Sequence, residues 1–130
     1  MSSADVETFL RGADGIARLD ADAVLEALHE DAVFEPPRAA TEGAYIGHEG
    51  MRRFLEDTAE TFEVFEPNLT DVRDLGDGRV LAIGTIRMRG RGSGLESDVT
   101  TAAIAEFRDG LMVRYKDYVD PRLAREVAGL

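Results

Sequence analysis

The amino-acid sequence predicts a single α+β domain spanning residues 1–130, with a helical first half and a second half made of long strands. Apolar residues recur at helical spacing up to about residue 62, and beyond it they alternate with polar residues in the period of two that is typical of strands. A chain of 130 residues has the length of one domain and can bury a core without disulfide bonds.

Three helices are expected in the first half and one short helix at the end. Gly12 and Gly15 weaken the first helix by about 1 kcal/mol each relative to alanine, but they would let another element approach closely. Asp20 is the expected cap of the second helix, and Pro121 is tolerated in the first turn of the last one. The predicted helices cover residues 5–19, 21–28 and 48–62 and a short segment that starts at Asp120-Pro121.

Short turns connect most of the predicted strands. Gly76-Asp77-Gly78 and Asp109-Gly110 are strong turn signals, residues 89–94 are rich in glycine, and residues 38–47 are expected to form a loop. Strands joined in this way form an antiparallel meander that helices cover on one face, and strong curvature leaves a cavity between the two layers. The predicted strands cover residues 32–35, 64–72, 80–89, 95–107 and 111–119.

Composition excludes several classes of function. The formal net charge of −11 argues against nucleic acid and anionic membranes as partners. The absence of cysteine excludes disulfides, thiolate metal sites and cysteine nucleophiles, and it suits a cytoplasmic location. His29 and His48, the only histidines, lack the spacing of a zinc site, so neither a metal nor another cofactor is expected.

The order of elements, together with four short stretches, resembles the SnoaL-like and ketosteroid-isomerase-like branch of the nuclear transport factor 2-like superfamily. The resemblance implies a cone-shaped, curved, mixed sheet packed on three helices, an interior pocket and frequent dimerisation through the sheet. It implies no single activity, because members isomerise, cyclise, hydrolyse, dehydrate or only bind. The stretches are Ala27–Phe34, Tyr45–Gly50, Asp109–Arg114 and Tyr118–Pro121.

Ketosteroid-isomerase chemistry needs an aspartate base and two oxyanion donors, a tyrosine and a protonated aspartate. The resemblance places these groups at Pro36, Gly12 and Ala103, so this mechanism is not expected. Arg87 and Asp98 match the arginine–aspartate pair of the epoxide-hydrolase branch only loosely.

Two aspartates near the end of the last predicted strand are the candidate catalytic residues. Asp117 shares one strand face with Tyr115 and Val119, so it is either a general acid or base among apolar groups or a salt-bridged aspartate at the rim. The resemblance implies that Asp120 matches the catalytic aspartate of polyketide cyclases, whereas its place before Pro121 is typical of a helix N-cap.

The expected pocket is largely apolar. Tyr45 is either a hydrogen-bond donor to a ligand carbonyl or a packed aromatic residue of its loop. Arg87, Arg89 and Arg91 alternate along one strand and form either a solvated or dimer-facing edge or an anion clamp. The other residues expected to bind substrate are Phe34, Phe54, Ile86, Val99, Thr101, Tyr115 and Val119.

The leading hypothesis is therefore a small-molecule pocket protein that performs cofactor-free acid/base chemistry on an apolar, carbonyl-bearing substrate. A buried, unpaired carboxylate in the cavity would favour this enzyme, whereas an apolar cavity would favour a non-catalytic binding module. A third hypothesis is a homodimerisation domain that uses Leu81, Ile83 and Met112 on an exposed outer sheet face.

Overall fold

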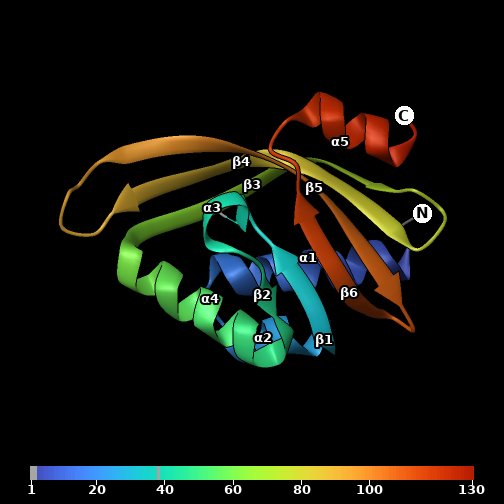
Figure 1. Cartoon of the computed structure of the whole chain (residues 1–130), viewed down its shortest axis with the longest axis horizontal. Helices are drawn as coiled ribbons and strands as arrows, with labels where there is room; N and C mark the ends of the chain where they lie inside the picture. The colour runs from blue at the N-terminus through green and yellow to red at the C-terminus, as the bar shows by residue number, and fades with distance from the viewer. Residues whose placement is uncertain (1–2, 38) are drawn as a thin grey trace.

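A computed structural model describes residues 3–37 and 39–130. It confirms the predicted α+β fold: a curved six-stranded sheet carries helices on both faces (Figure 1). The elements follow in the order α1 (Ala4–Ala17), α2 (Ala21–Glu26), β1 (Leu28–Glu35), α3 (Ala39–Glu42), β2 (Tyr45–Ile46), α4 (Gly47–Thr61), β3 (Phe62–Asp74), β4 (Arg79–Gly90), β5 (Glu96–Arg108), β6 (Leu111–Asp117) and α5 (Pro121–Ala128).

The sheet is mixed, with strand order β2-β1-β6-β5-β4-β3. The predicted antiparallel meander is confirmed for β3 to β6, while β1 lies parallel to β6. This parallel pairing explains why β1 begins earlier than predicted, since Leu28 already pairs with Met112. The prediction of a loop over residues 38–47 was wrong in part, because this segment contains α3 and β2; residue 38 lies outside the described residues.

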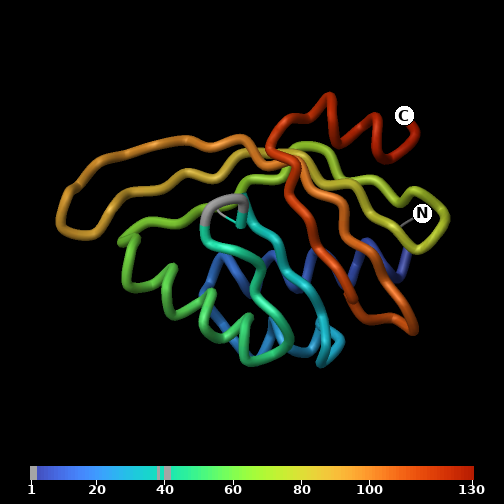
Figure 2. The backbone as a smooth tube through the Cα atoms, in the orientation of Figure 1, coloured from blue at the N-terminus to red at the C-terminus, as the bar shows by residue number. Residues whose placement is uncertain are grey.

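Local irregularities bend the long strands, and the bend is visible in the backbone trace (Figure 2). The register shifts between Leu69 and Asp71 in the β3–β4 pair, where a bulge increases the local twist. β3 crosses close to Gly84 at the same place: a Cβ on this residue would lie 2.1 Å from the carbonyl oxygen of Asn68. Glycine is therefore required where the sheet curves over the helices.

Helices α1, α2 and α4 pack on the inner face of the sheet and form the main core with it. As the two glycines in the first predicted helix suggested, α1 and α2 approach each other closely: a Cβ on Gly15 would lie 2.9 Å from Cγ2 of Val24. Phe9, Val24 and Met51 represent the three helices in this core.

Helix α5 lies on the opposite, outer face of the sheet (Figure 1). Ala124 is fully buried there, against a cluster that includes Leu81 and Ile104. The expectation that Leu81 and Ile83 form an exposed outer patch was wrong, because α5 covers them.

Met112 lies on the inner face rather than the outer one. A bulge between Glu106 and Phe107 pairs Phe107 with Met112 and leaves Val113 as an extra residue in β6, which shifts the alternation of faces. The homodimer through the sheet stays a prediction, but these residues are not its exposed surface.

We expect Ala124→Glu to lower the free energy of unfolding by about 3 kcal/mol, because it places a charged side chain in a filled apolar contact between α5 and the sheet. Thermal or urea unfolding measures the change. Leu123→Glu is the matched control, since Leu123 is 43% exposed on the same helix and should change stability little. Equal effects of the two variants would contradict the packing of α5.

Candidate functional site

A cavity of about 400 Å³ lies between the inner face of the sheet and the helices. Helices α1, α2 and α4 contribute to its wall together with β1, β3, β4, β5 and β6. Its volume is in the range of about 300–1,000 Å³ that is typical of small-molecule sites. The cavity is lined by Thr8, Phe9, Gly12, Ala13, Ile16, Val24, Ala27, Leu28, Phe34, Pro36, Pro37, Phe54, Phe62, Phe65, Pro67, Leu69, Ile86, Met88, Val99, Thr101, Phe107, Met112 and Tyr115.

Aromatic rings form one continuous part of the wall. The ring centroid of Phe34 lies 4.8 Å from that of Phe54 and 4.8 Å from that of Tyr115. The rings of Phe9 and Tyr115 are nearly parallel, with centroids 6.5 Å apart. Packed rings of this kind form a stiff apolar surface, against which a flat aromatic ligand can stack or pack edge to face.

Six of the residues expected to bind substrate line this cavity. They come from β1, α4, β4, β5 and β6. The predicted alternation of faces is confirmed where the strands are regular: Ile86 pairs with Val99, and both face the cavity. Their contact with a ligand stays a prediction. The six are Phe34, Phe54, Ile86, Val99, Thr101 and Tyr115.

Sequence reasoning missed the contribution of α1 and of the first part of β3. The apolar stripe of α1, including Phe9 and Ile16, reads from periodicity alone as ordinary core. Phe62 and Phe65 open β3, and only the curvature of the sheet brings them to the wall. An apolar residue that faces a cavity has the same sequence signal as one that faces a filled core.

Asp117 lies at the end of β6, is 9% exposed and does not line the cavity. Its Oδ1 accepts hydrogen bonds from the backbone N–H groups of Ala102, at 3.0 Å, and Val119, at 2.8 Å. Its Oδ2 accepts from the hydroxyls of Thr101 and Tyr115, the latter at 3.4 Å. These four donors occupy the acceptor positions of a carboxylate, and we call this cluster the carboxylate network.

The two hydroxyls of the carboxylate network belong to residues that line the cavity. Burial raises the pKa of the Tyr115 phenol, and the nearby charge of Asp117 raises it further. Tyr115 is therefore a neutral phenol that is hard to ionise. Asp117 reaches the cavity only through these hydroxyls, in contrast to the predicted catalytic carboxylate that contacts substrate directly.

Val119 does not line the cavity and is 41% exposed, so its predicted place in the pocket was wrong. The strand ends at Asp117, and the N–H of Val119 turns back to the Asp117 carboxylate. Val119 has φ +66°, a rare backbone conformation for a β-branched residue, and its side chain therefore leaves the face that Tyr115 occupies.

Asp120 is the N-cap of α5 and lies outside the cavity. Its side chain accepts a hydrogen bond from the backbone N–H of Arg122 at 2.9 Å, as the alternative interpretation of the sequence proposed. It stands on the outer side of the carboxylate network and is not positioned to contact a ligand in the cavity.

Tyr45 is buried in β2, and it does not line the cavity. Its ring packs edge to face on Phe54, with centroids 5.3 Å apart, and the Arg53 guanidinium lies over it. Its hydroxyl donates to Asp57 at 3.2 Å. Tyr45 is therefore a packed aromatic residue, which was the second of the two interpretations of the sequence. Phe34 and Phe54 line the cavity, whereas Tyr45 does not.

The positions that the resemblance assigns to isomerase chemistry carry no acid or base. Gly12 and Pro36 line the cavity, and Ala103 is buried opposite Asp117 in the β5–β6 pair. Arg87 and Asp98 are paired in register, but both are exposed on the face opposite to Ile86 and Val99. They do not form a polar pair inside the cavity.

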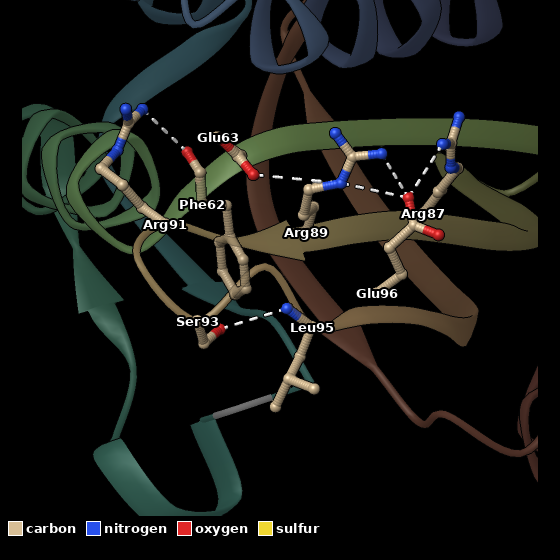
Figure 3. Close-up of polar contacts among 8 residues, drawn as sticks. All are labelled: Phe62, Glu63, Arg87, Arg89, Arg91, Ser93, Leu95 and Glu96. Carbon is tan, nitrogen blue, oxygen red and sulfur yellow. Dashed lines mark hydrogen bonds and ion pairs between the residues drawn. The ribbon is translucent and has the colours of Figure 1, made fainter.

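The outer part of the β4–β5 hairpin, residues 85–100, extends beyond the helices in Figure 1, and we call it the arm. Figure 3 shows that Glu96 accepts from both Arg87 and Arg89. The Arg89 guanidinium also lies 3.9 Å from the Glu63 carboxylate. The hydrogen bond from Arg89 lowers the pKa of Glu96 most. These arginines form a solvated ion-pair edge, as one of the two interpretations proposed.

Arg91, at the tip of the arm, forms hydrogen bonds with the junction between α4 and β3 (Figure 3). Its guanidinium donates to the carbonyl oxygens of Ala59, at 3.2 Å, and Phe62, at 3.1 Å. These carbonyls lie at the C-terminal end of a helix, where cations are favourable. Since Phe62 also lines the cavity, this contact holds one part of the cavity wall in place.

The chemical character of the cavity follows from these placements. Among the described lining residues none is charged, and side-chain hydroxyls come from Thr8, Thr101 and Tyr115. The hydroxyl of Thr8 accepts a hydrogen bond from Arg11 at 3.1 Å. The cavity can hold an apolar molecule and offer it a few polar contacts, but it presents no ionised general acid or base.

We expect Asp120→Ala to destabilise the chain by about 1 kcal/mol through loss of the helix cap, and Asp120→Asn to retain most of that stability. Urea unfolding measures the difference. Ligand affinity and any turnover should be unchanged in both variants. A loss of either in Asp120→Asn would assign the carboxylate a functional role.

We expect the free energy of unfolding to fall as the pH rises above about 10, by up to about 1.4 kcal/mol per pH unit, because Tyr115 ionises more readily in the unfolded chain than in the folded one. Tyr115→Phe should remove this part of the slope in urea unfolding between about pH 9 and 11. Tyr118→Phe is the matched control and should keep it. An unchanged slope in Tyr115→Phe would contradict the buried environment of this phenol.

The family model described as a SnoaL-like domain matches residues 6–115. A search of curated proteins gave no match. Among solved structures, TerC co-crystallised with polyporic acid superposes with a TM-score of 0.79 at 22% identity, covering 98% of this chain and 100% of TerC.

Two further solved structures share this fold. A nuclear transport factor 2-like protein of unknown function from Burkholderia pseudomallei has a TM-score of 0.79 and 19% identity, with 99% and 100% of the two chains covered. A SnoaL-like polyketide cyclase, so described, from Shewanella denitrificans has a TM-score of 0.73 and 19% identity, with the same coverage. The family model covers most of the chain, and the chain belongs to the SnoaL-like family, with a nuclear transport factor 2-like fold.

Proposed function

We propose that this chain binds a small, flat and largely apolar molecule in the cavity between the sheet and the helices. The observation that carries the proposal is the cavity of about 400 Å³ whose described lining contains hydroxyls but no charged side chain. Such a site stabilises a ligand by removing apolar surface from water, and its few polar groups orient the ligand.

The size of the cavity supports a binding role rather than imperfect packing. Protein interiors are packed as densely as organic crystals, and voids much larger than a water molecule are few and costly. Here the wall contains aromatic rings, among them Phe34 and Tyr115, that pack on one another and hold one another in place. A stiff wall keeps the cavity open and reduces the entropy lost on binding.

The fold itself is compatible with a ligand of this kind. TerC, at 22% identity, has been crystallised with polyporic acid, so a chain of this architecture accommodates a small organic molecule. At this level of identity the likeness concerns the fold, and the ligand of TerC is not carried over to this chain.

Binding is favoured over acid/base catalysis by the position of the carboxylates. Asp117 accepts four hydrogen bonds and lies behind Thr101 and Tyr115, while Asp120 caps a helix on the outside. The isomerase positions Gly12 and Pro36 also offer no base. A proton transfer in the cavity would have to pass through a neutral hydroxyl, which is a weak acid and a weaker base.

We expect naphthalene to bind saturably to the wild-type chain and about tenfold more weakly to Val99→Phe, because the added ring fills the cavity where half-buried Val99 forms its wall. The chain has no tryptophan, so the emission of naphthalene can be followed directly. Val127→Phe is the matched control, since Val127 is 43% exposed on α5 outside the cavity.

Two results would contradict the proposal. Absence of saturable binding by the folded wild-type chain would show that the cavity does not accept an apolar molecule. Equal affinity of Val99→Phe and the wild-type chain would place the binding site elsewhere.

A further inference from the structure

The carboxylate network determines which polar ligand atom fits the cavity, and this inference rests on the proposed binding function. A hydroxyl carries one proton to donate and two lone pairs that accept. The direction of that single proton therefore decides whether a cavity hydroxyl offers a donor or an acceptor to a ligand. In this chain the direction is set by Asp117, a residue that does not itself line the cavity.

Asp117 can only accept from its neighbours. The backbone N–H groups of Ala102 and Val119 occupy Oδ1, so the two hydroxyls of Thr101 and Tyr115 converge on Oδ2. The contact with Thr101 is the shorter of the two, and that with Tyr115 is 3.4 Å, at the long end of the hydrogen-bond range. A hydroxyl that donates to Asp117 directs its single proton toward the carboxylate rather than toward a ligand.

Thr101 and Tyr115 line the cavity, and a hydroxyl that gives its proton to Asp117 has only lone pairs left to offer a ligand. A ligand carbonyl placed here would meet a second acceptor and lose the hydrogen bonds that it makes in water. A ligand hydroxyl would instead donate into this pair of oxygens. We propose that the cavity selects flat apolar ligands that carry a hydrogen-bond donor, a phenol or enol hydroxyl, at the end that contacts Thr101 and Tyr115.

This inference revises the substrate class expected from sequence. A carbonyl was expected because a tyrosine near the pocket can donate a hydrogen bond. Tyr45 instead donates to Asp57, and Tyr115 donates to Asp117. The hydroxyl protons of both tyrosines are thus committed within the protein, and at the end of the cavity formed by Thr101 and Tyr115 the ligand has to supply the donor.

The test compares four probes that share one ring system: naphthalene, 2-naphthol, 2-methoxynaphthalene and 2-acetonaphthone. Calorimetric titration near pH 7 gives the affinity of each for the wild-type chain. We expect 2-naphthol to bind about five- to tenfold more tightly than 2-methoxynaphthalene, which can accept but not donate, and 2-acetonaphthone to bind no more tightly than naphthalene.

Asp117→Asn is the decisive variant, because the change is isosteric but reverses the polarity of one atom. The amide oxygen can still accept from Ala102 and Val119, while the NH₂ group donates to the two hydroxyls. Those hydroxyls must then turn their protons into the cavity. We expect the preference to invert, with 2-acetonaphthone gaining affinity relative to 2-naphthol. The ratio of the affinities for 2-acetonaphthone and 2-naphthol is compared between Asp117→Asn and the wild-type chain. Differences in size between the two probes therefore cancel.

Two further variants keep the inference testable if Asp117→Asn does not fold. Tyr115→Phe and Thr101→Val each remove one of the two oxygens, and both should reduce the ratio of the affinities for 2-naphthol and 2-methoxynaphthalene. Asp120→Asn makes the same chemical change outside the cavity and should leave all ratios as in the wild-type chain.

Each outcome separates this inference from the proposed function. Binding of naphthalene with no preference for 2-naphthol, or with a preference for 2-acetonaphthone, would overturn the inference and leave the proposed function in place. Failure of all four probes to bind would overturn both. A preference for 2-naphthol that survives in Asp117→Asn would also overturn the inference, because the direction of the hydroxyl protons would not be its cause.

Discussion

The hydrogen bonds to the Asp117 carboxylate join three parts of the molecule at one point. The carboxylate accepts from β5 at Ala102 and Thr101, from its own strand at Tyr115, and from the turn that follows at Val119. A buried carboxylate is costly without such partners, so the surrounding chain is held in the geometry that supplies them. The end of β6, the turn into α5 and the orientation of the cavity hydroxyls all depend on this arrangement.

The strained turn at Val119 is a consequence of the same arrangement. Its backbone adopts φ +66° while its N–H donates to Asp117, and α5 starts two residues later with Asp120 as its cap. Helix α5 then covers Leu81 and Ile83 on the outer face of the sheet. One side of the sheet is thus closed by the chain itself, while curvature at Gly84 opens a cavity on the other.

This chain has the fold of the SnoaL-like family but lacks the groups that ketosteroid-isomerase chemistry requires. The fold is retained over nearly the whole chain, at 19–22% identity to TerC and the two other structures compared above. The positions that isomerase chemistry requires hold Gly12, Pro36 and Ala103, and the Asp117 carboxylate is bonded to hydroxyls of residues that line the cavity. Function in such a scaffold is decided by a few side chains in the cavity rather than by the fold.

Periodicity and turn signals were sufficient to predict the α+β class, the strand meander and six residues of the cavity wall, because alternation along a regular strand such as β4 is a property of the local chain. They failed for Met112, where a bulge changes the face, and for Val119, where a left-handed turn ends the strand. They could not show that Thr101 and Tyr115 would donate to Asp117, since hydrogen bonds between strands depend on register. The environment of Asp117 was therefore decided by tertiary structure, which alone brings four donors from separate segments to one carboxylate.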